Sequence, residues 1–156
     1  MWLQIHDGHP VARQIADRHY SRGTKGARLF CGTGEKLVLI TQAYDALFVW
    51  RKQRFRLNDQ RGVECTLFRN EGMTLSSEMI KEACRWAWQR WPEERLFTYV
   101  RDSAIRSTNP GYCFQVAGWQ KCGRNKFGNL TILENCNYSG EKPTVLVQQL
   151  ALWVGR

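Results

Sequence analysis

Three short segments of the chain contain side chains that can move protons or bind polar ligands. "RHYS", residues 18–21, places His19 beside Tyr20, while "YVRD" ends at Asp102 and "NPGY" ends at Tyr112. Imidazole, carboxylate and phenol groups are the usual general acids and bases of enzymes. His19 and Tyr20 together also suit a proton relay or a pair of metal ligands.

Each of these residues also has a purely structural explanation. His19 could be a core histidine on an apolar helical face, and Tyr112 a half-buried tyrosine with a satisfied hydroxyl. Asp102 could cap the loop that follows it, or pair with Arg101 or Arg106. The residue types alone leave both explanations open.

Positive charge is concentrated around these segments. The chain has 23 Lys and Arg against 14 Asp and Glu, a net charge of +9, which suits a surface that meets phosphate. We expect the contacts with nucleic acid to come from Arg18, Ser21, Arg22, Lys25, Arg28, Arg106, Lys121 and Arg124. Binding through such residues would depend strongly on salt. The alternative for each arginine is a solvated surface.

The length and composition favour one folded domain, residues 1–156. A chain of 156 residues with 43% hydrophobic residues can bury a single core. The six cysteines form no CxxC pair, so we expect free thiols. No run of 18 apolar residues occurs, so we expect no membrane span and a cytoplasmic protein.

Hydrophobic patterning predicts the elements that position these segments. Strands are expected at 2–5, 35–42, 46–53, 62–71, 95–102 and 130–134, and helices at 10–20, 76–91 and 110–119. This order predicts an α/β (α+β) fold, with a mixed, mostly antiparallel sheet and helices on both faces. Residues 144–155 fit strand and helix equally poorly.

Capping residues set the expected helix ends. Ser76 or Ser77 suits the N-cap of the second long helix, which Pro92 ends. For the short helix we expect Asn109 at the N-cap, Pro110 at the first position, and Gly118 as the left-handed end.

Residues 95–123 resemble the second half of a GNAT acyltransferase. They combine a strand, a loop, a short helix with an aromatic near its start, an alanine-glycine-aromatic ending and a following strand. "RHYS", "FRNE" (68–71), "YVRD" and "NPGY" occur in that order between residues 15 and 134, and together they resemble the phage Mom family of DNA-modification proteins. The resemblance implies an enzyme that converts adenine in DNA to a carbamoylmethyl derivative at its exocyclic amine, which protects phage DNA from restriction. The family's functional positions fall on His19, Tyr20, Asp102 and Tyr112.

The resemblance also implies roles for these residues. The exocyclic amine of adenine is a poor nucleophile, so a base must remove a proton as the new bond forms, and Asp102 suits that task if partial burial raises its pKa. Tyr112 occupies the place from which GNAT enzymes protonate a departing thiolate. To reach this amine, the enzyme would have to flip the adenine out of the duplex or act on open DNA. Aromatic residues that could stack on that base are Tyr20, Tyr44, Trp50 and Trp119.

The group donor is expected at the loop between the strand at 62–71 and the following helix. This loop has one glycine, and an acidic residue where GNAT enzymes hold the pyrophosphate of coenzyme A. The expected donor is therefore an acyl or glycine-derived compound of open identity, with acetyl-CoA as one option. The expected donor-binding residues are Arg69, Asn70, Glu71, Gly72, Ser76, Ser77 and Asn109. Iron is a further option that the family suggests, but the sequence fixes no set of metal ligands. The oligomeric state is open, with a homodimer as one option.

Two other functions fit the same residues. One is a GNAT N-acetyltransferase that uses acetyl-CoA on a protein or small amine. The other is a basic DNA-binding protein that keeps the GNAT scaffold without catalysis.

Overall fold

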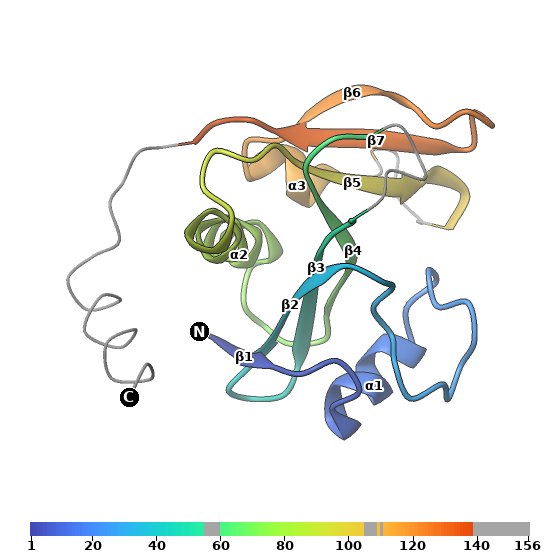
Figure 1. Ribbon diagram of the computed structural model, residues 1–156, viewed down its shortest axis with the longest axis vertical. Helices are drawn as coiled ribbons and strands as arrows, with labels where there is room; N and C mark the ends of the chain where they lie inside the picture. The colour runs from blue at the N-terminus through green and yellow to red at the C-terminus, as the bar shows by residue number, and fades with distance from the viewer. Residues whose placement is uncertain (55–59, 105–108, 110, 139–156) are drawn as a thin grey trace.

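The computed structural model describes residues 1–54, 60–104, 109 and 111–138 (Figure 1). Its centre is a seven-stranded sheet in the order β1-β2-β3-β4-β5-β7-β6. Its neighbouring strands are antiparallel except for β4 and β5, which run parallel. The strands are β1 (Trp2–Ile5), β2 (Glu35–Thr41), β3 (Ala46–Lys52), β4 (Val63–Asn70), β5 (Leu96–Arg101), β6 (Gln120–Arg124) and β7 (Leu130–Asn135). The mixed, mostly antiparallel sheet predicted from the sequence is confirmed.

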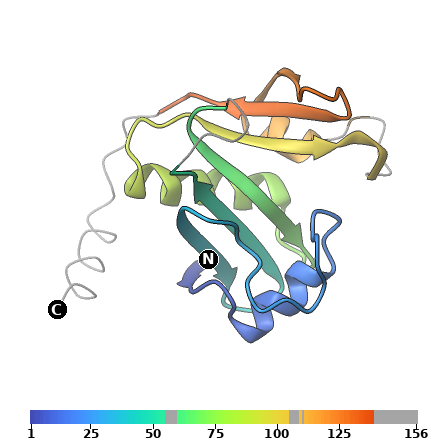
Figure 2. The ribbon, with the colours of Figure 1, turned by 45° about the vertical axis from the view of Figure 1, so that its right-hand side comes forward.

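Helices cover both faces of this sheet, as predicted (Figure 2). On one face, Ile15 of α1 (Pro10–Asp17) belongs to a buried cluster with Ile40. On the other, Ile80 of α2 (Ser76–Arg90) belongs to a cluster with Leu39 and with residues of α3 (Tyr112–Val116). Adjacent residues of β2 thus belong to opposite cores, because successive side chains of a strand point to opposite faces.

The first helix ends earlier than its periodicity predicted. α1 stops at Asp17, and the N–H groups of Arg18 and His19 donate to the carbonyls of Ile15 and Ala16 at 3.1 and 3.0 Å. The N–H of Arg22 then donates to the carbonyl of His19 at 3.1 Å. "RHYS" therefore forms a turn after the helix.

The predicted caps of the other helices are partly wrong. Leu75 is the N-cap of α2, so Ser76 and Ser77 are its first helical residues, although the helix does end at Arg90, before Pro92. The N-cap of α3 is Gly111, with φ +80°, in place of Asn109, whose carbonyl accepts the N–H of Tyr112. A side chain at position 111 would meet Leu133, because a Cβ would lie 2.6 Å from its Cδ1.

Two further predictions are confirmed, and one strand was not predicted. Gly118 has φ +96° and ends α3 in the left-handed region, as expected. All six cysteines are free thiols. β6 was absent from the elements predicted by hydrophobic patterning, because all five of its residues are exposed and it forms by pairing with β7. Pro110 and the segment 144–155 lie outside the described residues.

β4 and β5 separate along their length, which is plain in Figure 1. They pair through Val63–Leu96, Glu64–Phe97 and Cys65–Thr98, and no pairing follows within the described parts of the two strands. The facing edges from Thr66 and Tyr99 onward therefore present backbone groups to other segments. Within the described ranges, no helix is long and apolar enough to cross a membrane.

Candidate functional site

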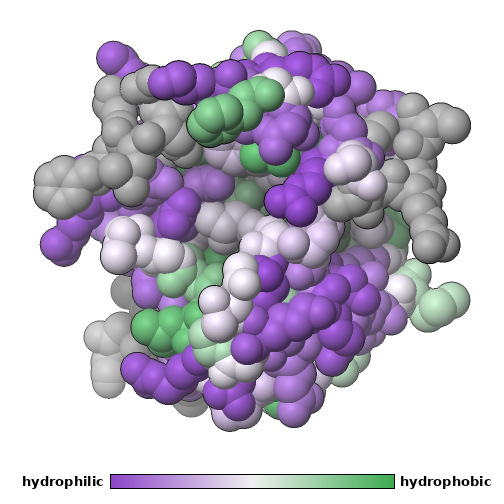
Figure 3. Space-filling view, turned by 90° about the vertical axis from the view of Figure 1, so that its right-hand side faces the viewer, coloured by the Kyte–Doolittle hydropathy of each residue, from purple (hydrophilic) through white to green (hydrophobic). Residues whose placement is uncertain are grey.

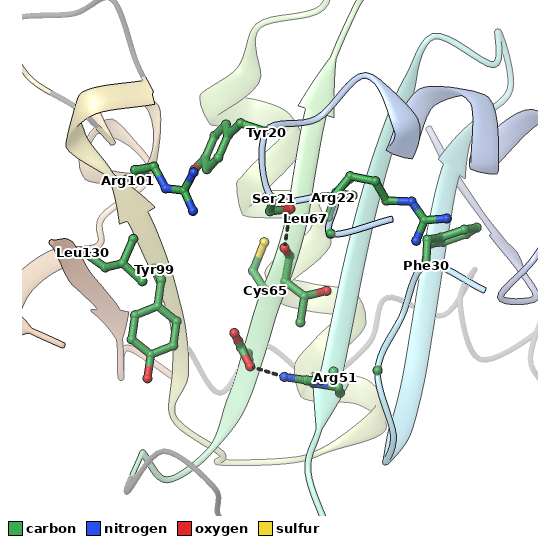
Figure 4. Close-up of a pocket in the computed structure, with 14 residues that line it drawn as sticks. Tyr20, Ser21, Arg22, Phe30, Arg51, Cys65, Leu67, Tyr99, Arg101 and Leu130 are labelled. Atoms are coloured by element: carbon green, nitrogen blue, oxygen red, sulfur yellow. Dashed lines mark hydrogen bonds and ion pairs between the residues drawn. The ribbon is translucent and has the colours of Figure 1, made fainter. Parts of the chain in front are cut away.

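Two cavities lie where β4 and β5 separate. The first, here called the apolar cavity, has a volume of about 360 Å³ and is lined by segments 19–21, 65–68, 98–100, 109 and 111–114. The second, here called the polar cavity, has about 330 Å³ and is lined by 20–23, 64–67, Phe30, Gly32, Arg51, Tyr99, Arg101 and Leu130 (Figure 4). They share Tyr20, Ser21 and Thr66, so together they form one composite site. Each volume is within the usual range for ligand sites.

The turn formed by "RHYS" bridges the separated strands. The single proton of the Ser21 hydroxyl is shared between His19 Nδ1 at 2.7 Å and the carbonyl of Thr66 at 3.4 Å. The His19 ring donates to the backbone of Phe68, which like Thr66 lies on β4. The Tyr20 phenol accepts a hydrogen bond from the backbone of Arg101 on β5. This turn supplies partners to the strand edges that the sheet leaves open, and it thereby becomes a wall of both cavities.

His19 is an uncharged member of this wall. Burial lowers the pKa of His19 to about 4, the nearby Arg69 guanidinium lowers it further, and the bond to Phe68 opposes them. Its Nδ1 accepts the Ser21 N–H at 3.1 Å and lies 2.7 Å from Ser21 Oγ. The imidazole is therefore neutral at physiological pH, with its proton on Nε2.

The two tyrosines predicted from the sequence lie at the same cavity. The Tyr20 ring stacks on His19 with centroids 4.3 Å apart, and the Arg101 guanidinium lies 6.0 Å from its centroid. Burial raises the pKa of Tyr20, so its phenol stays protonated. Tyr112 begins α3, is 62% exposed and lines the apolar cavity. Asn109 lines the same cavity.

Asp102 lies beside this site and lines neither cavity. It begins the short 3-10 turn η1 (Asp102–Ala104), and its carboxylate accepts hydrogen bonds from Thr131 Oγ1 at 3.0 and 3.1 Å and from Arg124 Nη2 at 3.1 Å. The observed ion-pair partner is thus Arg124, where the sequence suggested Arg101 or Arg106. Arg106 lies outside the described residues.

The expected donor loop is closed by its own hydrogen bonds. Arg18 binds both carboxylate oxygens of Glu71 at 2.7 and 2.6 Å, and Arg69 Nε donates to Glu71 at 2.6 Å. The Arg18 side chain, followed by Arg69, lowers the pKa of Glu71 to about 2. Asn70 donates to Thr74 and accepts from Gly72. The carboxylate is therefore already paired where a phosphate was expected.

Other members of the expected donor set are also accounted for. A Cβ at Gly72 would lie 2.2 Å from the Asp45 carboxylate, and Ser77 is buried, while the Ser76 hydroxyl bonds to Asn70 at 3.0 Å. Of the seven residues expected to bind the donor, Asn109 lines a cavity. The other six lie at the end of β4 (Arg69, Asn70), in the following loop (Glu71, Gly72) and at the start of α2 (Ser76, Ser77). The structure therefore separates Asn109 from the rest of the expected set.

The basic residues divide into two groups. Arg22 is wrongly placed among the phosphate contacts: its side chain is 7% exposed and donates to Asp17, Leu29 and Ala27, so it holds the loop together. Arg18 is paired with Glu71. Ser21, Lys25, Arg28, Lys121 and Arg124 are exposed, as is Arg18. Hydrophilic side chains dominate the face toward which the loop after α1 and the β6–β7 hairpin project (Figure 3).

Of the aromatic candidates for base stacking, Tyr20 is the one that lines the cavities. Trp50 and Trp119 are 0% and 2% exposed and stack on each other in the core, so their expected role is wrong. Tyr44 is exposed on the β2–β3 turn, where it stacks on His9 at 6.4 Å.

Sequence reasoning missed several cavity residues. Tyr99 and Arg101 share a face of β5 and line the polar cavity, and Figure 4 shows Arg101 pointing toward Tyr20. Strand alternation was the available signal, because Arg101 and its neighbour Asp102 do not share a face. Thr66 lines both cavities, and its Oγ1 is buried with no partner among the described residues. A buried polar atom without a partner suits a ligand that supplies one.

The described residues contain no group of three or more His, Cys, Asp or Glu that could hold a metal ion. No family model matches the chain, and no curated protein or solved structure matches it significantly. Fold and site together define an α/β protein with a ligand-sized composite site between two separated parallel strands.

Proposed function

We propose that the protein is a Mom-type transferase that modifies the exocyclic amine of adenine in double-stranded DNA, in the cytoplasm of a host cell. The observation that carries this proposal is the convergence of His19, Tyr20 and Tyr112, from distant segments, on one cavity between β4 and β5. Exposed Lys25, Arg28, Lys121 and Arg124 supply a basic surface around it.

The composite site suits an extruded base. Enzymes that act on a flipped base hold it by stacking and by hydrogen bonds to its polar edge. The Tyr20 ring offers a stacking face, and Thr66 Oγ1 offers a hydrogen-bonding group that has no partner within the described residues. Arg101, on the polar side, is placed to neutralise the phosphate of the extruded nucleotide.

Asp102 lies beside the cavities and lines neither of them, so in the proposed reaction it takes the proton of the adenine amine through one intervening water. The amine nitrogen forms a bond to the transferred carbon as this proton leaves. The bond from that carbon to its leaving group breaks, and Tyr112 protonates the leaving group. Arg124 holds Asp102 in the free protein, with 56% of its own side chain exposed. A DNA phosphate near Arg124 would compete for this guanidinium and release the carboxylate. The donor is an acyl or glycine-derived compound with such a leaving group.

Co-expression with a plasmid tests the proposal. Plasmid DNA would be hydrolysed to nucleosides and analysed by mass spectrometry, with Asp102→Asn as the matched inactive control. We expect a modified deoxyadenosine with the wild-type protein and none with the variant. Unmodified deoxyadenosine alongside verified wild-type expression would rule the proposal out.

A second candidate is an N-acetyltransferase that uses acetyl-CoA. It is favoured by the succession of β5, α3 with Tyr112 at its start, Ala117-Gly118-Trp119 and β6, which is the order of elements in the GNAT resemblance. Calorimetry separates the candidates: tight binding of coenzyme A favours the acetyltransferase, and absence of binding favours the DNA modifier with another donor.

A further inference from the structure

An exposed aromatic ring stands at the tip of the β6–β7 hairpin. Phe127 is 86% exposed, and the neighbouring Lys126 and Arg124 are exposed as well. The hairpin tip projects beyond the sheet at the side of the molecule that also carries the loop after α1 (Figure 1). A phenyl ring exposed in this way is available to a partner that covers it.

The turn that presents Phe127 is braced by hydrogen bonds that do not involve its side chain. Asn125 accepts the N–H of Leu130 through Oδ1 at 2.9 Å and donates to Asn129 at 2.8 Å. The N–H of Gly128 donates to the carbonyl of Asn125 at 2.9 Å, and Arg124 donates to the carbonyl of Gly128 at 3.0 Å. The ring is therefore presented on an ordered support, which lowers the entropic cost of inserting it into a partner.

The hairpin is connected directly to the composite site. Leu130 lines the polar cavity and pairs with Arg101, and Arg124 binds Asp102. Three residues span at most about 10 Å, so the backbone of Phe127 lies within that distance of the cavity wall at Leu130. This is less than the width of the major groove, about 12 Å, so one bound duplex can contact both the hairpin tip and the cavity wall.

We infer that Phe127 is a wedge that enters the base stack of duplex DNA and occupies the space left by the extruded adenine, while Lys126 and Arg124 bind the flanking phosphates. The inference rests on the proposed function. Apolar side chains inserted between base steps unstack them in other DNA-binding proteins. Here the ring and the flanking cations lie on one hairpin, which reaches the wall of the receiving cavity through Leu130.

The experiment uses Phe127→Ala and, as a matched control, Met73→Ala. Met73 is 100% exposed on the β4–α2 loop, away from the hairpin. The probe is duplex DNA in which 2-aminopurine replaces adenine throughout, so that all sequence contexts are present. Its fluorescence rises when the base leaves the stack, and anisotropy measures binding of the same DNA.

We expect wild type and Met73→Ala to raise the fluorescence equally. With Phe127→Ala the rise in fluorescence should be at least tenfold smaller, while the affinity for the duplex falls less than threefold. Phe127→Trp should restore the rise. A full rise with Phe127→Ala, or a wild-type protein that leaves duplex fluorescence unchanged, would overturn the wedge.

The same variants separate this inference from the proposed function. If wild type raises the fluorescence through Phe127 but leaves co-expressed plasmid unmodified, the wedge stands and the reaction assignment fails. If wild type and Phe127→Ala modify plasmid DNA equally, the reaction assignment stands and the wedge is overturned.

Discussion

Nδ1 of His19 lies 2.7 Å from Oγ of Ser21 and accepts the backbone N–H of Ser21 at 3.1 Å. These two bonds fix the imidazole within a three-residue turn, while its opposite side donates to the backbone of Phe68. The ring is thus held against β4 on one side and stacked on Tyr20 on the other. His19 is therefore best understood as a neutral, rigid part of the cavity wall that positions Tyr20 and Ser21.

The titration of His19 is the first prediction. Burial lowers its pKa to about 4 from an ordinary 6.5, so between these values the unfolded chain binds more protons than the folded protein. The neutral ring's contribution to stability is complete above pH 6.5 and is lost as pH falls toward 4. We expect the ring resonances of His19, followed by NMR, to titrate near pH 4. A midpoint above 6 would contradict the geometry.

A variant isolates the energetic consequence. Asn at position 19 keeps an acceptor near the position of Nδ1 but does not titrate. We expect the free energy of unfolding of the wild type to fall by about 1–3 kcal/mol more than that of His19→Asn between pH 7 and pH 4.5. Equal pH dependence of the two proteins would show that His19 is not the group responsible.

Asp102→Asn is the second prediction. The amide still accepts from Thr131, and the lost ion pair with the exposed Arg124 should cost about 0–1 kcal/mol of stability. A missing general base lowers a rate by about 10²–10⁴-fold, so we expect modification of co-expressed plasmid to fall below detection. Thr131→Val is the matched control: it removes the hydroxyl contact but keeps the carboxylate. Modification by Asp102→Asn at the wild-type level would exclude the base role.

Most of the sheet could be predicted from the sequence, because strand formation depends on local patterning. Less of the site could be predicted, because the site depends on long-range contacts. Apolar runs rich in β-branched and aromatic residues identified β2 and β3, whereas β6 has an exposed, polar sequence and exists through pairing with β7. Likewise, "RHYS" was identified as a site by residue type. Its attachment to Thr66 and Arg101 follows from the separation of β4 and β5, which leaves no local signal.

Charge alone gave a wrong prediction for Arg22, because its hydrogen-bond partners determine whether an arginine is available to bind phosphate. Arg22 and Lys25 are both basic residues of the same loop, and the sequence does not distinguish them. Arg22, however, donates to three acceptors close to it in the chain, and its side chain is buried among them. Trp50 and Trp119 are aromatic, as Tyr20 is, and were therefore predicted to stack on a base. In the structure they are buried between the sheet and its helices. Partner geometry of this kind becomes visible only in three dimensions.

Glu71→Gln is the third prediction. The bidentate Arg18 pair and Arg69 hold the pKa of Glu71 at about 2, so the carboxylate stabilises the fold above its ordinary pKa of 4.5, and that contribution is lost as pH falls toward 2. The side chain is 25% exposed, and solvent screening limits the effect to about 1 kcal/mol at pH 7. Urea unfolding at pH 7 and pH 3 measures it: the difference from wild type should shrink at pH 3. An unchanged difference would contradict the ion-pair explanation.

The fourth prediction contrasts two arginines of the same loop. Arg28 is exposed, so Arg28→Ala should leave stability within about 0.5 kcal/mol of the wild type. If it contacts phosphate, the slope of log K against log salt for duplex DNA should fall by about 0.9. Arg22→Ala should instead lower the free energy of unfolding clearly more than Arg28→Ala does, because it leaves the Asp17 carboxylate and two carbonyls without their charged donor.

Two measurements on both variants test this contrast. Thermal or urea unfolding gives the stability, and fluorescence anisotropy at several salt concentrations gives the salt dependence of DNA binding. The salt slope of Arg22→Ala, measured at a temperature where it is folded, should equal that of the wild type, because its guanidinium is covered by protein. A reduced slope with full stability for Arg22→Ala would show that the arginine leaves its loop to bind DNA. An unchanged slope for Arg28→Ala would remove Arg28 from the nucleic-acid interface.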